Sequence, residues 1–230
     1  MSDPISYHDT LAANWDERYL RGGFARRARL FAERILPLLP RHGRWLDAGC
    51  GSGTFSRILA DTRDVVGVDA SEAMLAEAMD RSATLARPPS FHSVATIEKL
   101  PFESQSFEGI LCLSVLEYVD NPKRALLEMS RVVKQGGTVV ISVPHRLSIV
   151  RQMQAAYVRV HARSRGNVRY LNLSKYTTTP REMRRFLGDC GLVPRWMLTF
   201  DTLIPSKLHW LLKPSLIYAV CEKSSPASNQ

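Results

Sequence analysis

The sequence predicts an α/β fold in which a parallel sheet is covered by helices on both faces. Short apolar runs, with the length of buried strands, alternate with segments whose apolar residues recur at helical spacing. The first run, residues 45–48, leads into a turn with glycines at alternate positions, Gly49, Gly51 and Gly53, and a helical pattern follows directly. In α/β proteins a strand, a glycine turn and the start of a helix form a ligand-binding loop.

Composition indicates one domain over residues 1–230. A chain of 230 residues with 45% hydrophobic and 23% charged residues can bury a full core. No run of about twenty apolar residues occurs and no signal-peptide pattern opens the chain, so we expect neither a membrane span nor secretion. The cysteines show no paired spacing, which favours reduced thiols in a cytoplasmic protein; they are Cys50, Cys112, Cys190 and Cys221.

A second apolar run, residues 65–69, ends in an acid that suits a nucleoside. Asp69 follows Gly53 by sixteen residues, and a carboxylate at that place can accept hydrogen bonds from both hydroxyls of a ribose. The loop does not fit the dinucleotide pattern G-x-G-x-x-G, because Thr54 or Ser56 stands at its sixth position. Asp47, just before the loop, would repel a pyrophosphate but attract an ammonium or sulfonium group.

These motifs resemble the S-adenosylmethionine site of the class I methyltransferases. The resemblance is carried by L-D-A-G-C-G-S-G at 46–53, V-G-V-D-A-S at 66–71, E-K-L-P-F at 98–102 and S-F-E-G-I-L-C at 106–112, and by residues 126–137. It extends over residues 45–143 and is greatest to the small-molecule branch that includes the ubiquinone-biosynthesis O-methyltransferases. It implies a Rossmann-like, seven-stranded sheet in the order 3-2-1-4-5-7-6, with strand seven antiparallel and S-adenosyl-L-methionine bound over the ends of strands one, two and four.

The other elements are expected around this core. Strands are expected at 45–48, 65–69, 91–95, 107–113, 138–143, 192–199 and 215–221, and helices at 54–60, from 71, 122–133, 147–160 and from 179. An N-terminal helical cap, 7–40, should hold one helix from Tyr7 to the glycine pair 22–23 and a second over 24–39. In the second, Leu30, Phe31, Ile35 and Leu38 are expected to face inward and the arginines outward. Residues 144–190 and 200–214 are expected to cover the substrate, and 224–230 to form a loose tail.

The resemblance implies a set of cofactor contacts. Thr96 stands where the family has an acid that binds the adenine amino group, so it would serve as a weaker, neutral acceptor. Tyr19 belongs to the leading helix that caps the cofactor in the family, although its aromatic residues could equally serve packing alone, as could Met74. The expected contacts are Asp47, Gly49, Cys50, Gly51, Gly53, Thr54, Phe55, Asp69, Ala70, Met74, Thr96, Ile97, Glu98, Leu113, Ser114 and Tyr19.

Three residues are candidates for a general base, which would help if the acceptor is a phenol or an acid. Glu117 and Tyr118 follow strand four and His145 follows strand five. We favour Glu117; the alternative is a helix-end carboxylate paired with solvent or an arginine. Related quinone enzymes bind a divalent metal here, but Val115 and Tyr118 replace the second acid and the histidine, so we expect no catalytic metal.

Positive charge is concentrated in the segments that flank the core. The net charge is +9, and residues 144–214 hold thirteen Lys or Arg against three acids, while residues 18–44 hold eight arginines against Glu33 alone. Such charge indicates either a solvated basic face or an anionic partner. Residues 203–214 mix apolar side chains with lysines, so they could form an inward-folding lid or contact an anionic membrane as a peripheral protein.

We therefore expect S-adenosylmethionine-dependent methyl transfer to a small hydrophobic, lipid-like or quinone-like acceptor. One alternative is an RNA methyltransferase, which the charge alone suggests. Base-methylating enzymes of this fold usually carry an N-P-P-Y type motif after strand four, and L-S-V-L-E-Y-V at 113–119 does not resemble it, so nucleic acid is not an expected partner. The other alternative is a binding protein that uses the cofactor for different chemistry.

Overall fold

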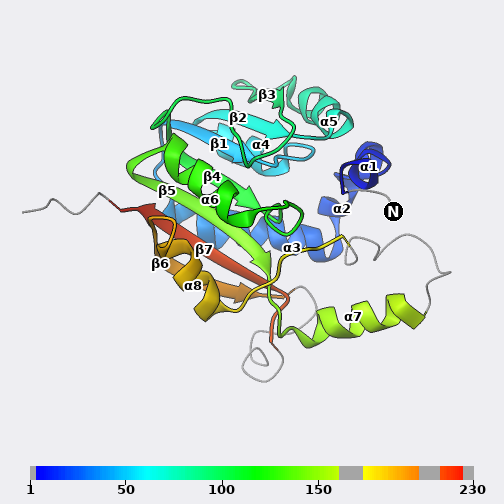
Figure 1. Ribbon diagram of the computed structural model, residues 1–230. Helices are drawn as coiled ribbons and strands as arrows, with labels where there is room; N and C mark the ends of the chain where they lie inside the picture. The colour runs from blue at the N-terminus through cyan, green and yellow to red at the C-terminus, as the bar shows by residue number, and fades with distance from the viewer. Residues whose placement is uncertain (1–3, 161–172, 202–212, 225–230) are drawn as a thin grey trace, which may run out of the picture.

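The chain folds around one twisted sheet of seven strands. The computed structural model describes residues 4–160, 173–201 and 213–224 (Figure 1). The strands are β1 (Arg44–Ala48), β2 (Asp64–Asp69), β3 (Ser90–Ser93), β4 (Phe107–Leu113), β5 (Val133–Pro144), β6 (Leu192–Phe200) and β7 (Leu216–Lys223). Their order is β3-β2-β1-β4-β5-β7-β6, and β7 runs antiparallel to both β5 and β6. The expected strand order is therefore confirmed.

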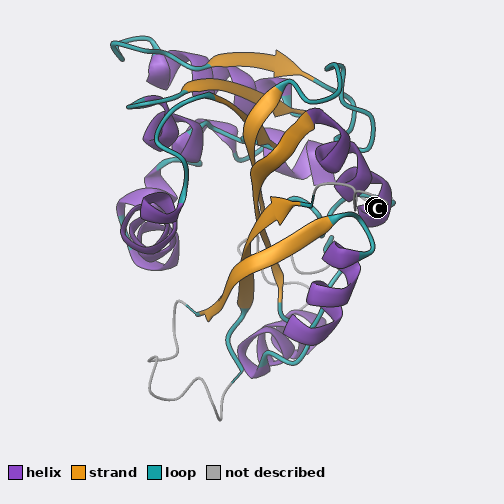
Figure 2. Ribbon diagram, turned by 90° about the vertical axis from the view of Figure 1, so that its left-hand side faces the viewer, coloured by secondary structure: helices purple, strands orange, loops and turns teal. Residues whose placement is uncertain are grey.

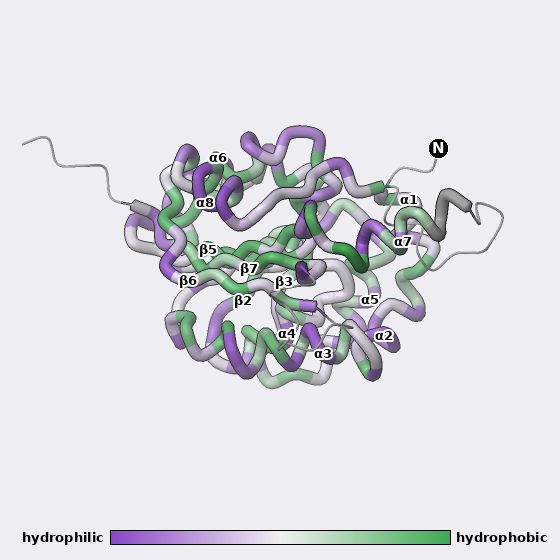
Figure 3. Tube along the Cα trace, turned by 90° about the horizontal axis from the view of Figure 1, so that it is seen from below, coloured by the Kyte–Doolittle hydropathy of each residue, from purple (hydrophilic) through white to green (hydrophobic). Residues whose placement is uncertain are grey.

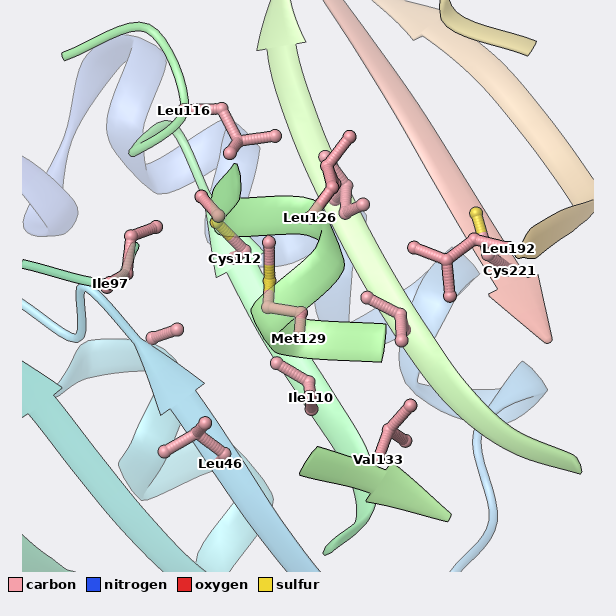
Figure 4. Packing of buried hydrophobic residues seen from close by; sticks show 14 of the residues in the cluster. Leu46, Ile97, Ile110, Cys112, Leu116, Leu126, Met129, Val133, Leu192 and Cys221 are labelled. Atoms are coloured by element: carbon pink, nitrogen blue, oxygen red, sulfur yellow. The ribbon is translucent and has the colours of Figure 1, made fainter. Parts of the chain in front are cut away.

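Helices cover both faces of the sheet, as Figures 2 and 3 show. One face carries α6 (Pro122–Val132) and α8 (Pro180–Gly188), and the other carries α3 (Gly22–Leu30), α4 (Thr54–Ala60) and α5 (Glu72–Ser82). The strands alternate accordingly: in β4, Ile110 and Cys112 pack toward α6, whereas Leu111 and Leu113 pack toward α3 and α4. Figure 4 shows the α6 side of this core.

The N-terminal segment differs from the single helix that its spacing predicts. It forms α1 (Pro4–Asp9), a 3-10 turn (Ala12–Asn14) and α2 (Glu17–Leu20), and Gly22 begins α3 instead of following a long helix. The interruptions let two acids reach the core: Asp9 accepts a hydrogen bond from the Ser71 hydroxyl, and Asp16 accepts one from Thr54. These contacts favour the interrupted helices over the single helix that the spacing of the apolar residues predicts. They hold α1 and α2 at the carboxyl ends of the parallel strands (Figure 1).

Two expectations for the second N-terminal helix are wrong. The helix α3 continues into a π-helical turn (Phe31–Ile35) and a 3-10 turn (Leu36–Leu38), and Leu38 is exposed. Arg27 does not face outward, since it is only 8% exposed. It precedes Phe31 by four residues and therefore shares the buried face of the helix.

The segment after β5 leaves the sheet. The helix α7 (Ile149–Val160) lies beyond the carboxyl ends of the parallel strands (Figure 1), and residues 173–179 return alongside the loop after β4, where the backbone N–H of Lys175 donates to the carbonyl of Glu117. Much of the expected substrate cover, 161–172 and 202–212, and the tail 225–230 lie outside the described residues. Among the helices that the structure describes, none is both long and apolar enough to span a bilayer.

The pairing of β1 with β4 generates a first prediction about stability. Trp45 lies opposite Gly109 and is fully buried, and a Cβ added at Gly109 would come within 2.5 Å of the indole ring. We expect Gly109→Ala to lower the free energy of unfolding by about 1–3 kcal/mol through overpacking. Chemical denaturation measures this. Gly188→Ala, where an added Cβ meets nothing within 4 Å, is the matched control. Equal stability of the two variants would contradict the proposed ring contact.

Candidate functional site

The glycine loop between β1 and α4 leaves one open backbone position. Gly49, Gly51 and Gly53 have φ of 81°, 54° and 75°, a region that residues with a Cβ rarely adopt. An added Cβ would collide with Val115 at Gly49 and with Phe91 at Gly53, but it would meet nothing within 4 Å at Gly51. The outer two glycines therefore allow close packing, whereas Gly51 presents bare backbone that a ligand can approach.

Asp69 holds this loop from the end of β2. Its Oδ2 accepts the backbone N–H of Gly51 at 2.8 Å, and its Oδ1 accepts that of Ser71 at 3.0 Å. Each carboxylate oxygen can accept a second hydrogen bond. The arrangement thus fixes the carboxylate beside the open glycine and leaves capacity for two further hydrogen bonds, while its contact with ribose hydroxyls stays a prediction.

Asp47 lies behind the loop. It is 2% exposed and accepts a hydrogen bond from the Ser56 hydroxyl at 2.6 Å. Burial, together with the nearby charge of Asp69, raises the pKa of Asp47 to about 7, against the opposing effect of Ser56. Near neutral pH this carboxyl group is therefore only partly ionised, so its attraction for a cationic group is weaker than the sequence suggests.

The N-terminal segment closes over the loop through Asp16, a residue that the sequence analysis did not single out. Asp16 accepts hydrogen bonds from the hydroxyls of Ser52 and Thr54, and it forms an ion pair with Arg57. Tyr19, from the same segment, stacks edge-on against Phe55 with 5.9 Å between ring centroids. Burial raises the pKa of Tyr19 to about 12, so its phenol is neutral at pH 7.

The remaining expected cofactor contacts have different surroundings. Glu98 uses its Oε1 to accept the backbone N–H groups of Asp120 and Asn121, just before α6. Thr96 accepts the backbone N–H of Glu98 at 3.1 Å. The other side chains of this group are packed in the core, namely Cys50, Met74, Ile97 and Leu113, while Ala70 is half-buried beside Asp69. Their contacts with the cofactor remain predictions.

Glu117 is buried where the chain leaves β4. It is 3% exposed, and its Oε2 has no hydrogen-bond partner among the described residues. Burial raises the pKa of Glu117 to about 7, although Arg151, Arg27 and Ser114 lower it. Ser114, three residues earlier, has φ of 58°, which is unusual for a residue other than glycine. Strained backbone and an unpartnered carboxyl oxygen are features that functional sites retain.

Arg27 meets this edge of the sheet from α3. Its Nε donates to the Tyr218 hydroxyl at 2.8 Å, and its Nη2 donates to the Ser142 hydroxyl at 3.3 Å. Ser142 Oγ also accepts the backbone N–H of Ser114 at 3.0 Å. We call these five residues the Arg27 cluster: Arg27, Tyr218, Ser142, Ser114 and Glu117. Arg27, Ser142 and Tyr218 were not predicted from the sequence. For Arg27, the four-residue spacing to Phe31 and on to Ile35 could have indicated that it lies on the buried face of its helix.

The other two base candidates are less suited to accept a proton. His145 is buried, its Nδ1 accepts the backbone N–H of Leu147 at 3.0 Å, and burial lowers its pKa. The neutral ring must then carry its proton on Nε2, which leaves no free acceptor nitrogen. Tyr118 packs its ring edge-on against His8, with centroids 5.5 Å apart. Glu117 is therefore the favoured base.

The buried carboxyl groups make stability depend on pH. The pKa of Glu117 is raised in the folded protein, so folding costs more as pH rises from about 4.5 through 7. We expect Glu117→Gln to unfold at a higher temperature than the wild type at pH 8 and to lose this advantage at pH 5, with each unit of pKa shift contributing about 1.4 kcal/mol. Asp64→Asn, an exposed carboxylate, is the control. Parallel pH profiles for wild type and Glu117→Gln would refute the shift.

Asp69 and Thr96 should contribute unequally to cofactor binding. Two charge-assisted hydrogen bonds from ribose, each worth about 1.5–3 kcal/mol, predict at least a hundredfold loss of affinity in Asp69→Ala. Thr96→Ala removes at most one neutral bond and should cost less than about tenfold. Calorimetry with S-adenosylhomocysteine measures both. Comparable losses would show that the ribose lies elsewhere.

Comparison with known proteins finds likenesses to methyltransferases over part of the chain. Residues 46–141 match the model of a methyltransferase domain. An uncharacterised protein of Methanocaldococcus jannaschii is 34% identical over 118 residues, which cover 50% of this chain and 53% of that protein. The demethylmenaquinone methyltransferase of Staphylococcus aureus is 29% identical over 163 residues, which cover 64% of this chain and 67% of the enzyme.

A solved structure extends the likeness to nearly the whole fold. The magnesium protoporphyrin IX methyltransferase of Synechocystis, crystallised with bound S-adenosylhomocysteine, superposes with a TM-score of 0.70 at 18% identity and covers 96% of this chain and 98% of the other. The seven-stranded order, the open glycine and Asp69 at the end of β2 agree with that cofactor. Residues 46–141 therefore match a methyltransferase domain, and the solved structure shows that nearly the whole chain shares its fold.

Proposed function

We propose that this protein transfers a methyl group to a small hydrophobic, lipid-like or quinone-like acceptor, with Glu117 as general base. The observation that carries the proposal is the unpartnered, buried Oε2 of Glu117 at the carboxyl end of β4. This end of the sheet also presents the glycine loop, because Val115 packs against Gly49. The likeness to a demethylmenaquinone methyltransferase supports a quinone-like acceptor.

The cofactor supplies a methyl group on a positively charged sulfur, which is a good leaving group, so the protein's task is alignment and exclusion of water. Holding two reactants in line can be worth about 7–11 kcal/mol of the barrier. The N-terminal segment serves this task, since Asp9 and Asp16 tie it to Ser71 and to the glycine loop. The ring of Phe24 contacts those of Trp15 and Tyr19, and Tyr19 contacts Phe55 on α4, so these rings add an apolar cover.

Glu117 is matched to proton abstraction near neutral pH. A carboxyl group with a pKa of about 7 is partly ionised there, and it binds a proton more firmly than an exposed glutamate does. Its Oε2 has no partner among the described residues that would have to be displaced. An acceptor hydroxyl donating to this oxygen would lose its proton as the bond to the methyl carbon forms.

Methyl transfer can be tested without knowing the acceptor. Incubation with methyl-labelled S-adenosylmethionine and a cell lysate, followed by extraction into organic and aqueous phases, should place the label in the organic phase. Once an acceptor is found, Glu117→Gln should lower kcat by about 100-fold or more, whereas Glu72→Gln, at an exposed position in the first turn of α5, should not. Full activity of Glu117→Gln would remove the base from the mechanism.

The same assay tests the expected lack of a metal. Val115 and Tyr118 break the ligand set of related quinone enzymes, and the described residues contain no cluster of three or more acids, histidines or cysteines suited to a metal. We expect a chelator to leave the rate unchanged. Loss of activity on chelation that magnesium restores would show that the ligands come from elsewhere.

We further propose that the acceptor reaches the site from an anionic membrane surface. Near the start of α7, the exposed apolar residues Leu147, Ile149 and Met153 lie beside Arg146 and Arg151, and Met153 is 67% exposed. Apolar side chains flanked by basic ones suit a bilayer interface, where each basic residue contributes about 1 kcal/mol. The mixed segment 203–212, which motivated this idea, lies outside the described residues.

Vesicle sedimentation checks the membrane proposal. The protein should bind vesicles that contain phosphatidylserine but not vesicles of phosphatidylcholine, and high salt should release it. Met153→Asp should weaken binding, while Leu127→Asp, at an exposed apolar position on α6, should not. Absence of binding at low salt would end this proposal and leave methyl transfer intact.

A further inference from the structure

We propose that the acceptor is an oxygen acid, such as a phenol, an enol or a hydroxyquinone, and that Arg27 holds its ionised oxygen while Glu117 takes its proton. The inference rests on the proposed methyl transfer and goes beyond it, because it names the chemical class of the acceptor and a residue that selects it. It is carried by the Arg27 cluster.

Arg27 is a buried cation with neutral hydrogen-bond partners. Its guanidinium donates to the hydroxyls of Tyr218 and Ser142, and it lies 5.6 Å from the centroid of the Phe55 ring. Within the described part of the chain, no carboxylate lies at ion-pair distance from it. An arginine keeps its charge even when buried, and an uncompensated buried charge is costly. An anion that reached Arg27 would therefore be strongly attracted to it.

Strand alternation explains why these groups converge. Ser142 on β5 lies directly opposite Tyr218 on β7, and Leu113 on β4 lies opposite Ser142 on its other side. Residues at these positions share the face of the sheet that α3 covers, so Arg27 reaches them from above. The cluster thus sits at the carboxyl edge of the sheet, where Ser114 follows the end of β4 and the chain turns toward Glu117.

Glu117 supplies the complementary half of the site. Ser114 and Ser142 connect it to Arg27, with 3.5 Å between the two serine Oγ atoms. The charged groups that act on Glu117 are Arg151 from α7 and Arg27 from α3, while Tyr19 and Tyr218 act on Arg27 as buried phenols. Arg27 thus supplies a buried positive charge and Glu117 a buried carboxylate that can accept a proton, and the two side chains do not bond to each other directly. This pair suits a ligand that brings a single acidic proton.

The charges balance through one turnover. The acceptor enters as a neutral acid, and its proton moves to Oε2 of Glu117, which leaves its oxygen negative beside Arg27. That oxygen then forms a bond to the methyl carbon while the carbon–sulfur bond breaks and its electron pair stays on sulfur. The product ether is neutral, has no charge for Arg27 to hold, and leaves. The proton on Glu117 returns to solvent.

A coloured probe tests the inference directly. 2-Hydroxy-1,4-naphthoquinone is an acid with a visible absorption band in its ionised form, and 2-methoxy-1,4-naphthoquinone is its neutral, methylated counterpart. With S-adenosylhomocysteine bound, the wild type should bind the hydroxy compound at least about tenfold more tightly than the methoxy compound, a difference of about 1.4 kcal/mol. The pH midpoint of the visible band should fall on binding, because Arg27 stabilises the anion.

Variants separate recognition from folding. Arg27→Gln should abolish the preference and the shift of the midpoint, Arg27→Lys should retain part of both, and Arg29→Gln, at an exposed arginine on the same helix, should retain both. An arginine with only a structural role would change the melting temperature without changing the preference. Should Arg27→Gln fail to fold, Arg27→Lys and the wild-type preference still decide the question.

Two outcomes distinguish this inference from the proposed function. If the wild type binds S-adenosylhomocysteine but binds the two quinones equally, or binds neither, the acceptor is not an acid of this class and methyl transfer still stands. If the wild type does not bind S-adenosylhomocysteine, methyl transfer itself fails. Retention of the preference in Arg27→Gln would assign the anion to another residue.

Discussion

Side chains point alternately to the two faces of the sheet along β4, β5 and β7. This alternation decides which residues lie together near the carboxyl ends of the parallel strands. In β4, β5 and β7 the apolar residues of one parity pack under α6 and α8 and form the larger core. The alternate residues of these strands face α3 and α4. They are apolar along most of this face, but near the carboxyl ends of β4 and β5 the polar residues Ser142 and Tyr218 take their place. A one-residue slip of β7 against β5 would move Tyr218 to the opposite face and remove the partner of Arg27.

Burial then sets the charges at this edge. Asp47 is removed from water by the packing of β1 between two helical layers, and Glu117 is buried in the loop after β4. Both carboxyl groups have a pKa of about 7 as a result. Arg27 keeps its charge in the same environment. Two carboxyl groups that can gain or lose a proton near neutral pH, one of them acted on by the permanent charge of Arg27, respond to the charge of a ligand more strongly than exposed groups would.

The N-terminal segment contacts both the glycine loop and the region after β4. Its acids reach the glycine loop and the start of α5, and its aromatic residues contact Phe55 on α4 and, through His8, the ring of Tyr118 after β4. These contacts couple the cofactor loop to the region where the acceptor is expected. The short helices α1 and α2 have little intrinsic stability, so their order depends on this network of side-chain contacts.

The sequence alone determined the sheet and the cofactor loop, because both depend on local patterns. Short apolar runs, glycines at alternate positions and an acid after the second strand are properties of neighbouring residues, and the structure places Gly51 and Asp69 together as those patterns predict. The sequence also proposed Glu117 as a base from its place after β4, and that role stays a prediction. Tertiary structure decided the rest: it broke the expected first helix so that Asp9 and Asp16 could reach the core, and it buried Arg27 while Arg26 and Arg29 on the same helix face solvent. The packing of α3 against β5 and β7 decides which arginine of the helix reaches Ser142 and Tyr218. Contacts between residues more than a hundred positions apart leave no periodic signal in the sequence, so this choice could not be predicted from it.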